Sequence, residues 1–328
     1  MSDFFRRHRN VLGICLVGLI FAVLPLFFKG GYLLNALIMI LLFAYLAQCW
    51  DIIGGFAGQV SFGHAAFFGV GPYVSITLSI HLGLMPWVGM VIGGVLAVFV
   101  AFLFSYPTFA YGLRGPYFSL ATLALSAMLS IFVSNIKFLG GAQGLLVPYY
   151  EQSIVYLQFA SKSSYYYLIL IFTVMLLFVI HRIKYSRFGF YLAAIREDED
   201  AAESLGINTK RLKMKAMLLS AFLIALGGTL YAQYLSFIDP EILAVPFSIE
   251  ILLPAIIGGT GTLFGPLLGS ILLISIKEGI RLWVGHGYTG LSMVIYGIIL
   301  ILVIILFRRG LSPLLAKAFI SRPAREKA

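Results

Sequence analysis

The chain has 328 residues, of which 61% are hydrophobic and only 11% charged, and its mean hydropathy is +0.99. Soluble domains carry about 25% charged residues, so this composition excludes an ordinary soluble protein and predicts a membrane protein. The net charge of +10 would also suit a nucleic-acid-binding protein, unless the basic residues follow a topological pattern.

Apolar segments that are long enough to cross a bilayer, which takes about 20 residues, recur along the whole chain. The ten predicted segments are 11–28, 31–50, 64–81, 86–106, 116–136, 165–182, 214–235, 247–258, 262–282 and 288–307. We therefore predict an all-α, polytopic transmembrane helical bundle of about ten membrane segments with Gly-interrupted or re-entrant stretches. The segment 247–258 is short and contains Pro254, so it is expected either to cross the membrane or only to dip into it.

Most of the basic residues lie in three clusters. One cluster precedes the first apolar segment, one lies within residues 182–215, and one follows the last apolar segment. Together they hold 17 of the 23 lysines and arginines. Because basic residues gather in cytoplasmic loops, the N-terminus, the central segment and the C-terminus are predicted to be cytoplasmic, and no nucleic-acid partner is expected. The predicted divisions are a basic N-terminus (1–10), a first membrane group (11–182), a coupling loop (183–213), a second membrane group (214–307) and a basic tail (308–328).

Residues 54–73, "GGFAGQVSFGHAAFFGVGPY", place six glycines and three polar side chains between two apolar segments. At membrane depth, irregular backbone is tolerated only where protein or a water-filled cavity covers it. We predict a broken helix or re-entrant turn that lines a solute path, with Gln59, Ser61 and His64 in the path. The alternative is a helix-packing surface whose Ser and His bond to neighbouring helices.

A second interrupted stretch covers residues 106–125. Its helix-breaking residues are Pro107, Gly112, Gly115 and Pro116. Arg114 and Tyr117 lie in this stretch and are the remaining candidates for the solute path. Arg114 could help to close the path, or it could simply anchor a tight turn at the membrane surface.

Charge is concentrated in residues 193–215. Five of the 13 acidic residues fall within seven positions, 197–203, and four basic residues follow at 210–215. Acids favour the first turn of a helix, and Gly206 suits the position that ends one, so a short helix over about 197–205 is predicted. Such dense, segregated charge favours docking of a separate protein, whereas a solvated loop is the alternative.

The third glycine-rich stretch is 258–270, where Gly261, Gly265 and Gly269 are spaced by four and should share one helix face. Its start, "IIGGTGTLFG" (256–265), also echoes "IIGGFAGQVSFG" (52–63), as duplicated halves would.

Ionisable residues in or near the membrane segments are Asp51, Glu250, Lys277, Glu278 and Arg281. Glu278 and Arg281 are three apart and could pair on one helix face. The three carboxylates motivate an alternative function, an ion-coupled secondary transporter. Clustered carboxylates at one depth, which ion coupling favours, are missing from the sequence.

Motifs of catalysis are missing from the sequence. It contains no HExxH, no G-x-S-x-G and no G-x-x-x-x-G-K-[ST] phosphate loop, and its two cysteines lie in apolar segments, which suggests neither a disulfide nor a thiol metal site. We therefore expect no cofactor, no metal and no enzyme activity, and the chain cannot by itself hydrolyse ATP in the P-loop manner.

Asp200-Ala201-Ala202, followed by three residues and Gly206, resembles the "E-A-A-x-x-x-G" coupling loop of ABC importer permeases. The chain departs from that loop in having Asp for Glu and "KRLKMKAML" where "I-x-L-P" is usual. With "GGFAGQVSFGHAAFFGVGPY", "LRGPYFSLATLAL", "AIREDEDAAESLGIN" and "PAIIGGTGTLFGPLLGS" in this order, most of residues 30–310 resembles the permeases of branched-chain amino-acid ABC importers, of the LivM type.

This resemblance implies a transport subunit of an ATP-driven importer in the bacterial cytoplasmic membrane. Its expected partners are two ABC ATPase subunits, a second permease subunit that is a paralogue, and an extracytoplasmic binding protein that delivers a leucine-, isoleucine- or valine-like solute. Relatives that carry urea or short amides leave the solute open. The residues implied in coupling to the ATPase are Arg196, Glu197, Asp198, Glu199, Asp200, Ala201, Ala202, Glu203 and Gly206.

Overall fold

The computed structural model of the chain describes residues 2–27, 31–150, 152–284, 289–306 and 310–311. Within these ranges the fold is all-helical apart from one short pair of antiparallel strands, β1 (Leu145–Leu146) and β2 (Phe237–Ile238). The α-helices are α1 (Ser2–Phe27), α2 (Gly31–Gly54), α3 (His64–Leu82), α4 (Pro86–Ala110), α5 (Pro116–Asn135), α6 (Lys162–Lys184), α7 (Arg187–Glu197), α8 (Glu199–Ser204), α9 (Thr209–Leu235), α10 (Val245–Gly258), α11 (Gly265–Val284) and α12 (Thr289–Leu306). Three 3₁₀ turns are η1 (Lys137–Leu139), η2 (Gly141–Gln143) and η3 (Pro240–Leu243).

Seven of these helices are long and apolar enough to cross a membrane, namely α1 to α6 and α9. Each of the ten predicted segments falls on a helix, which confirms the polytopic helical fold. The helix α10 has only 14 residues, or about 21 Å at 1.5 Å per residue, and a hydrocarbon core is about 30 Å thick. The segment that we expected either to cross or to dip is therefore too short to cross.

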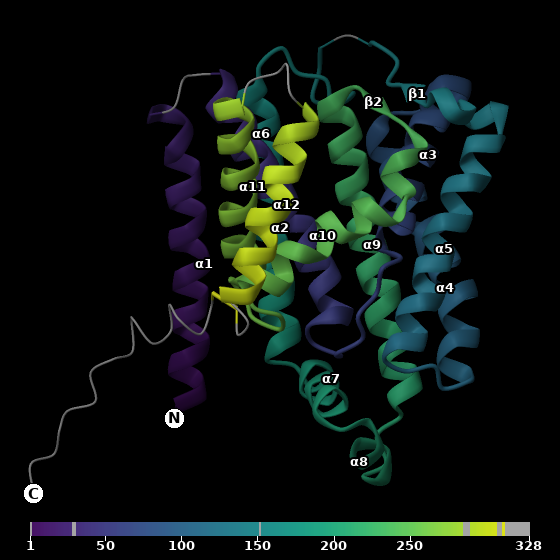
Figure 1. Ribbon diagram of the computed structural model, residues 1–328, viewed down its shortest axis with the longest axis vertical. Coiled ribbons are helices and arrows are strands. Elements are labelled where there is room, and N and C mark those ends of the chain that lie inside the picture. The colour runs from purple at the N-terminus through teal and green to yellow at the C-terminus, as the bar shows by residue number, and fades with distance from the viewer. Residues whose placement is uncertain (1, 28–30, 151, 285–288, 307–309, 312–328) are drawn as a thin grey trace, which may run out of the picture.

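The long helices stand side by side, and the shorter elements mark the two ends of the bundle (Figure 1). The helices α7 and α8 lie beyond one end, which also holds the start of α1; we call it the α8 end. The strands β1 and β2 lie at the opposite end. Between the two ends, α10 lies across the bundle at about mid-height (Figure 1).

The helix α2 forms the centre of the packed core and contacts α6, α9, α10 and α11. A helix that is surrounded in this way is apolar on every side, as the sequence of α2 is. The helices α3 and α9 approach each other through glycines. A Cβ atom at Gly71 would lie 2.1 Å from the carbonyl oxygen of Ala225, and one at Gly228 would lie 2.1 Å from that of Phe68. Small residues are what allow such close packing in membranes.

Both interrupted stretches that the sequence predicts are found. The helix α2 ends at Gly54 and α3 begins at His64, while α4 ends at Ala110 and α5 begins at Pro116. Residues 55–63 are thus irregular backbone, and most of them are buried.

Hydroxyl groups of α5 satisfy part of the irregular backbone in residues 60–62 and in η3. They lie three or four residues apart, on one face of the helix. The four contacts are Ser119 Oγ to Val60 O (2.7 Å), Phe62 N to Thr122 Oγ1 (3.0 Å), Ser126 Oγ to Leu243 O (2.5 Å) and Ser130 Oγ to Pro240 O (3.0 Å). Backbone that leaves the helical pattern at membrane depth needs such partners, and our sequence analysis missed this stripe.

Two expectations about the last third of the chain are wrong. Gly261 does not share a helix face with Gly265 and Gly269, because it lies in the turn before α11 with φ +72°. Glu278 does not pair with Arg281 within the described residues; instead it accepts a hydrogen bond from the hydroxyl of Tyr32, 2.6 Å away on α2. In both cases the three-dimensional arrangement differs from what the spacing in the sequence predicts.

Candidate functional site

The charged central segment forms two helices at the α8 end. Ser186 caps α7 by accepting a hydrogen bond from the amide of Gly189, and Asp198 Oδ1 caps α8 by accepting from the amides of Asp200 and Ala201, each at 3.0 Å. Gly206, with φ +80°, follows the last turn of α8, a conformation that glycine favours. The predicted helix over 197–205 is therefore confirmed as Glu199–Ser204, two residues later at its start, whereas α7 was not predicted.

Arg114, from the turn between α4 and α5, meets the acids of α8. Its Nη1 lies 2.5 Å from Asp200 Oδ1, its Nε 3.3 Å from Glu199 Oε2 and its Nη2 3.8 Å from Glu203 Oε2. The hydrogen bond that Arg114 donates to Asp200, together with the nearby negative charges, raises the pKa of Arg114 above the ordinary arginine value. One of the path candidates therefore contacts the segment predicted to dock the ATPase.

Lys213 of α9 anchors α8 from the inside. Its side chain is 1% exposed, and its Nζ lies 2.5 Å from Glu199 Oε1 and 5.2 Å from the centre of the Phe109 ring. The two oxygens of Glu199 are thus divided between Lys213 and Arg114. Through this single carboxylate, α8 is tied to α9 and to the α4–α5 turn.

The remaining side chains of α8 define its outer surface. Ala202 is buried against the bundle, whereas Glu197, Asp198 and Ala201 are exposed and Leu205 is 82% exposed. An exposed leucine next to small and acidic side chains can be covered by another protein. Three exposed residues in and next to this helix are called here the outer face of α8: Glu197 at the end of α7, Ala201 in α8, and Leu205 directly after α8.

Arg196, in the last turn of α7, lies between two glycine-rich turns. Its Nη1 donates a hydrogen bond to the carbonyl oxygen of Gly55 at 2.7 Å. A Cβ atom at Gly58 would lie 3.1 Å from Arg196 Cγ, and one at Gly261 would lie 2.5 Å from Arg196 Nη1. The guanidinium group thus contacts the α2–α3 segment and the α10–α11 turn at the same time.

Asp51 joins these two turns directly. Its side chain, buried in the last turn of α2, accepts hydrogen bonds from the amide of Gly261 at 2.9 and 3.0 Å. The two "IIGG" segments that echo each other in the sequence each end a helix, α2 or α10, and they meet here. From the sequence, Asp51 was predicted only to be an ionisable residue near a membrane segment, with no site assigned to it.

The five path candidates do not meet in one site, although two of them, Ser61 and His64, are in contact. Ser61 and His64 are fully buried, and the His64 ring nitrogens are hydrogen-bonded to Ser61 Oγ (2.9 Å) and Ser220 Oγ (2.8 Å). These contacts hold the start of α3 against α9. Gln59 is buried, with no hydrogen-bond partner at its Oε1, whereas Tyr117 is 73% exposed at the start of α5.

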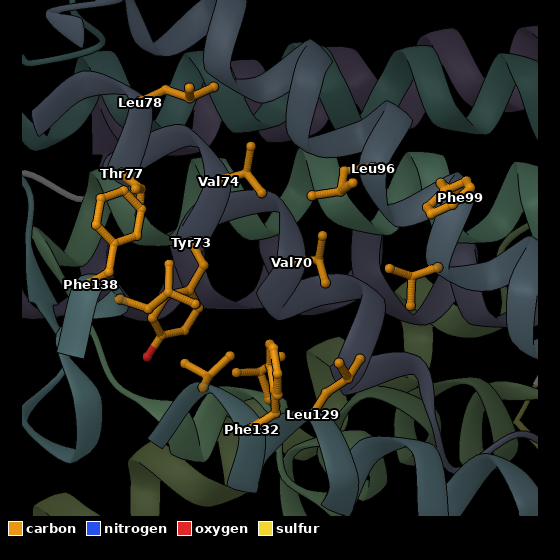
Figure 2. Close-up of a pocket in the computed structure, with 14 residues that line it drawn as sticks. Val70, Tyr73, Val74, Thr77, Leu78, Leu96, Phe99, Leu129, Phe132 and Phe138 are labelled. Carbon is orange, nitrogen blue, oxygen red and sulfur yellow. The ribbon is translucent and has the colours of Figure 1, made fainter. Parts of the chain in front are cut away.

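A hollow of about 410 Å³ lies between α3, α4 and α5. Figure 2 shows the side chains around it, among them Val70, Leu96, Phe99 and Phe132. Its wall offers no charged group, so it suits hydrocarbon better than a charged solute.

Comparison with known proteins places the chain in a family. The family described as "Branched-chain amino acid transport system / permease component" matches residues 32–304. The chain belongs to this family. It is therefore a transport permease, and its apolar helices make it a multi-pass membrane protein.

Curated relatives agree with this assignment. The permease is 28% identical to the high-affinity branched-chain amino acid transport system permease protein LivM of Escherichia coli, over 80% of this chain and 66% of that one. It is 27% identical to LivM of Salmonella typhimurium, over 84% and 69%, and 26% identical to LivH of Escherichia coli, over 70% and 79%. The match thus spans about two thirds of the length of the LivM relatives. A solved structure, PsaBC from Streptococcus pneumoniae in complex with Fab, aligns with a TM-score of 0.44 and 19% identity over 84% of this chain and 92% of that one.

Proposed function

We propose that this permease is a membrane subunit of an ATP-driven ABC importer for branched-chain amino acids, and that α8 docks an ATPase subunit. The observation that carries the proposal is the position of α8. It lies beyond the end of the bundle, it is fixed from behind by Arg114 and Lys213, and its outer face is open. A surface held in this way can transmit a movement of the ATPase to the bundle, because α8 cannot shift relative to the bundle unless its ion pairs break.

In this proposal Arg196 passes the movement of α7 and α8 into the bundle. Its guanidinium touches both Gly55 and Gly261, and the two turns lead directly into α3 and α11. The bond between Asp51 and Gly261 makes the turns respond together. In this proposal, a movement of the predicted coupling residues reaches the membrane helices through Arg196.

The solute path is proposed to run along the α2–α3 segment and α5. Gln59 and Tyr117 line it and Arg114 lies near its cytoplasmic mouth, while Ser61 and His64 support its wall from within the core. The chain then works in the bacterial cytoplasmic membrane with α8 and both termini in the cytoplasm. Its partners are two ATPase subunits, a paralogous second permease and an extracytoplasmic binding protein.

A single substitution on the outer face of α8 tests the docking. Leu205→Arg places a charge where an apolar side chain is exposed, and Leu205→Met keeps an apolar side chain of similar size. Purification in mild detergent should recover a P-loop ATPase with the wild-type chain and with Leu205→Met, but not with Leu205→Arg. Equal recovery with all three chains contradicts the docking surface, and a wild-type chain that carries no ATPase and needs no ATP for uptake contradicts the importer.

The ion-coupled alternative gains no support from the carboxylates that suggested it. Asp51 binds the amide of Gly261, Glu278 binds Tyr32 and Glu250 pairs with Lys277. They lie on three different helices and do not share one site, as ion coupling would favour. Uptake that collapses with an ionophore and needs no ATPase would bring this alternative back.

A further inference from the structure

One ion pair lies outside the site described so far. Lys277 Nζ of α11 donates to both carboxylate oxygens of Glu250 on α10, each at 3.1 Å. The side chain of Lys277 is 42% exposed and that of Glu250 is 40% exposed. The pair is therefore formed but open on one side.

The pair includes a residue of α10, a short helix inside the bundle. The helix α10 lies at about mid-height in the bundle (Figure 1) and ends at Gly258, and the next residue, Gly259, has φ +115°. Charged side chains at this depth are costly in hydrocarbon and are found facing a water-filled cavity or other protein. Short, interrupted helices of this type also mark solute sites in transporters.

We propose that the solute path continues from the α2–α3 segment and α5 to α10, which contacts α2, α3 and α5, and that Glu250 and Lys277 line it there and bind the charged ends of an α-amino acid zwitterion. The inference rests on the proposed function and names the chemistry by which its solute is recognised. The Glu250 carboxylate would accept hydrogen bonds from the α-ammonium group, and Lys277 would donate to the α-carboxylate. Without solute the two residues neutralise each other, so neither of these two charges is left unpaired.

This arrangement distinguishes amino acids from the other solutes considered for this type of permease. Urea and short amides carry no charged groups, whereas the zwitterion carries one of each sign, so a Glu–Lys pair would offer urea or an amide no ionic partner. The apolar hollow between α3, α4 and α5 offers no ionic group either. Among the described residues, Glu250 and Lys277 thus form a site of the right polarity at mid-depth.

The chain contains a matched control for a structural role of the charges. Glu278 is the neighbour of Lys277 on α11, but its carboxylate accepts a hydrogen bond from Tyr32 on α2 and takes no part in the pair. Replacing Glu278 by Gln removes a membrane charge from the same turn of the same helix. It should leave solute recognition intact.

The decisive experiment measures ATP-driven uptake of leucine by the complete complex in proteoliposomes. The double variant Glu250→Gln/Lys277→Gln keeps hydrogen-bonding groups but has no charges, and uptake should fall about tenfold or more, as loss of charged hydrogen bonds implies. Glu278→Gln should transport like wild type, and ATP hydrolysis stimulated by the binding protein should persist in both variants. Wild-type uptake by the double variant, or an equal loss in Glu278→Gln, overturns the inference.

A second measurement covers the case in which the double variant does not assemble. Ile249→Cys, beside Glu250 and 39% exposed, is combined with Cys15→Ser, because Cys15 is exposed whereas Cys49 is buried. In membranes that hold the complex, a water-soluble thiol reagent should label Cys at 249, and leucine should slow the labelling while leucinamide, which lacks the carboxylate, should not. Absence of labelling, or equal protection by both compounds, contradicts the site. A wild-type complex without ATP-dependent uptake contradicts the importer instead.

Discussion

Two acid–lysine pairs of this permease have the same chemistry and opposite surroundings. Lys213 and Glu199 at the α8 end are 1% and 10% exposed, whereas Lys277 and Glu250 at mid-height are 42% and 40% exposed. A buried pair is fixed, because breaking it leaves a charge without solvent. An open pair can exchange its partner for a solute. Burial, more than residue type, therefore separates a structural tie from a site available to a ligand.

The comparison also changes how the acids of the central segment are understood. From the sequence, all five acids between positions 197 and 203 were available to basic residues of a partner. In the structure Asp198 caps α8, while Glu199 and Asp200 contact Lys213 or Arg114. Much of the negative charge is thus used to hold α8 in place, and the outer face depends on Glu197, Ala201 and Leu205.

The largest effect is expected at Gly258, where the backbone of α10, the helix of Glu250, packs closely against that of α11, the helix of Lys277. A Cβ atom at Gly258 would lie 1.7 Å from the carbonyl oxygen of Gly265 and 3.0 Å from the amide nitrogen of Gly269. Gly258→Ala should separate α10 from α11 and lower the free energy of unfolding by more than about 3 kcal/mol, because backbone atoms must move. Gly279→Ala is the control, since a Cβ there meets nothing within 4 Å and alanine suits a helix better than glycine. Thermal unfolding in detergent measures both, and equal stability of the two variants would refute the packing argument.

The buried pair should be the next most sensitive. Lys213→Met leaves Glu199 with Arg114 as its remaining partner, so we expect a loss of about 2–3 kcal/mol, at the lower end for a broken buried pair. Adding Glu199→Gln removes the stranded charge and should recover most of that loss. A double variant that is as unstable as Lys213→Met would mean that packing of the lysine stem on Phe109, and not its charge, holds α8.

Much of the fold follows from local signals, and most of the site does not. The apolar segments, the capped α8 and the breaks at Gly54 and Pro116 are all encoded within a few residues. The contact of Arg114 with Asp200 joins residues 86 apart, and that of Asp51 with Gly261 joins residues 210 apart. Such contacts depend on how the helices pack, which periodicity does not determine.

One missed feature was nevertheless visible in the sequence. The hydroxyl residues of α5 recur every three or four positions and so share one helix face. In an otherwise apolar segment that pattern predicts a face turned toward irregular backbone or water. The stripe pairs with residues 60–62 and η3 in the structure.

The smallest effect is expected at Arg114, whose side chain pairs with the acids of α8 and is 40% exposed. Arg114→Gln should cost less than about 1 kcal/mol, because solvent screens exposed ion pairs. That cost should shrink further between about 0.1 and 1 M salt, as the screening length falls, while the cost of Lys213→Met should stay constant. The hydrogen bond that Arg114 donates to Asp200 raises the pKa of Arg114. The stabilisation from this pair is therefore fully present below the ordinary arginine pKa and is lost only above the raised value, so alkaline titration to about pH 9 should not alter it. Unfolding of both variants across salt and pH measures the contrast. Equal salt dependence of the two variants would show that solvent screens the Arg114 and Lys213 ion pairs equally. The distinction between a buried pair and an open pair would then rest on Glu250 and Lys277 alone.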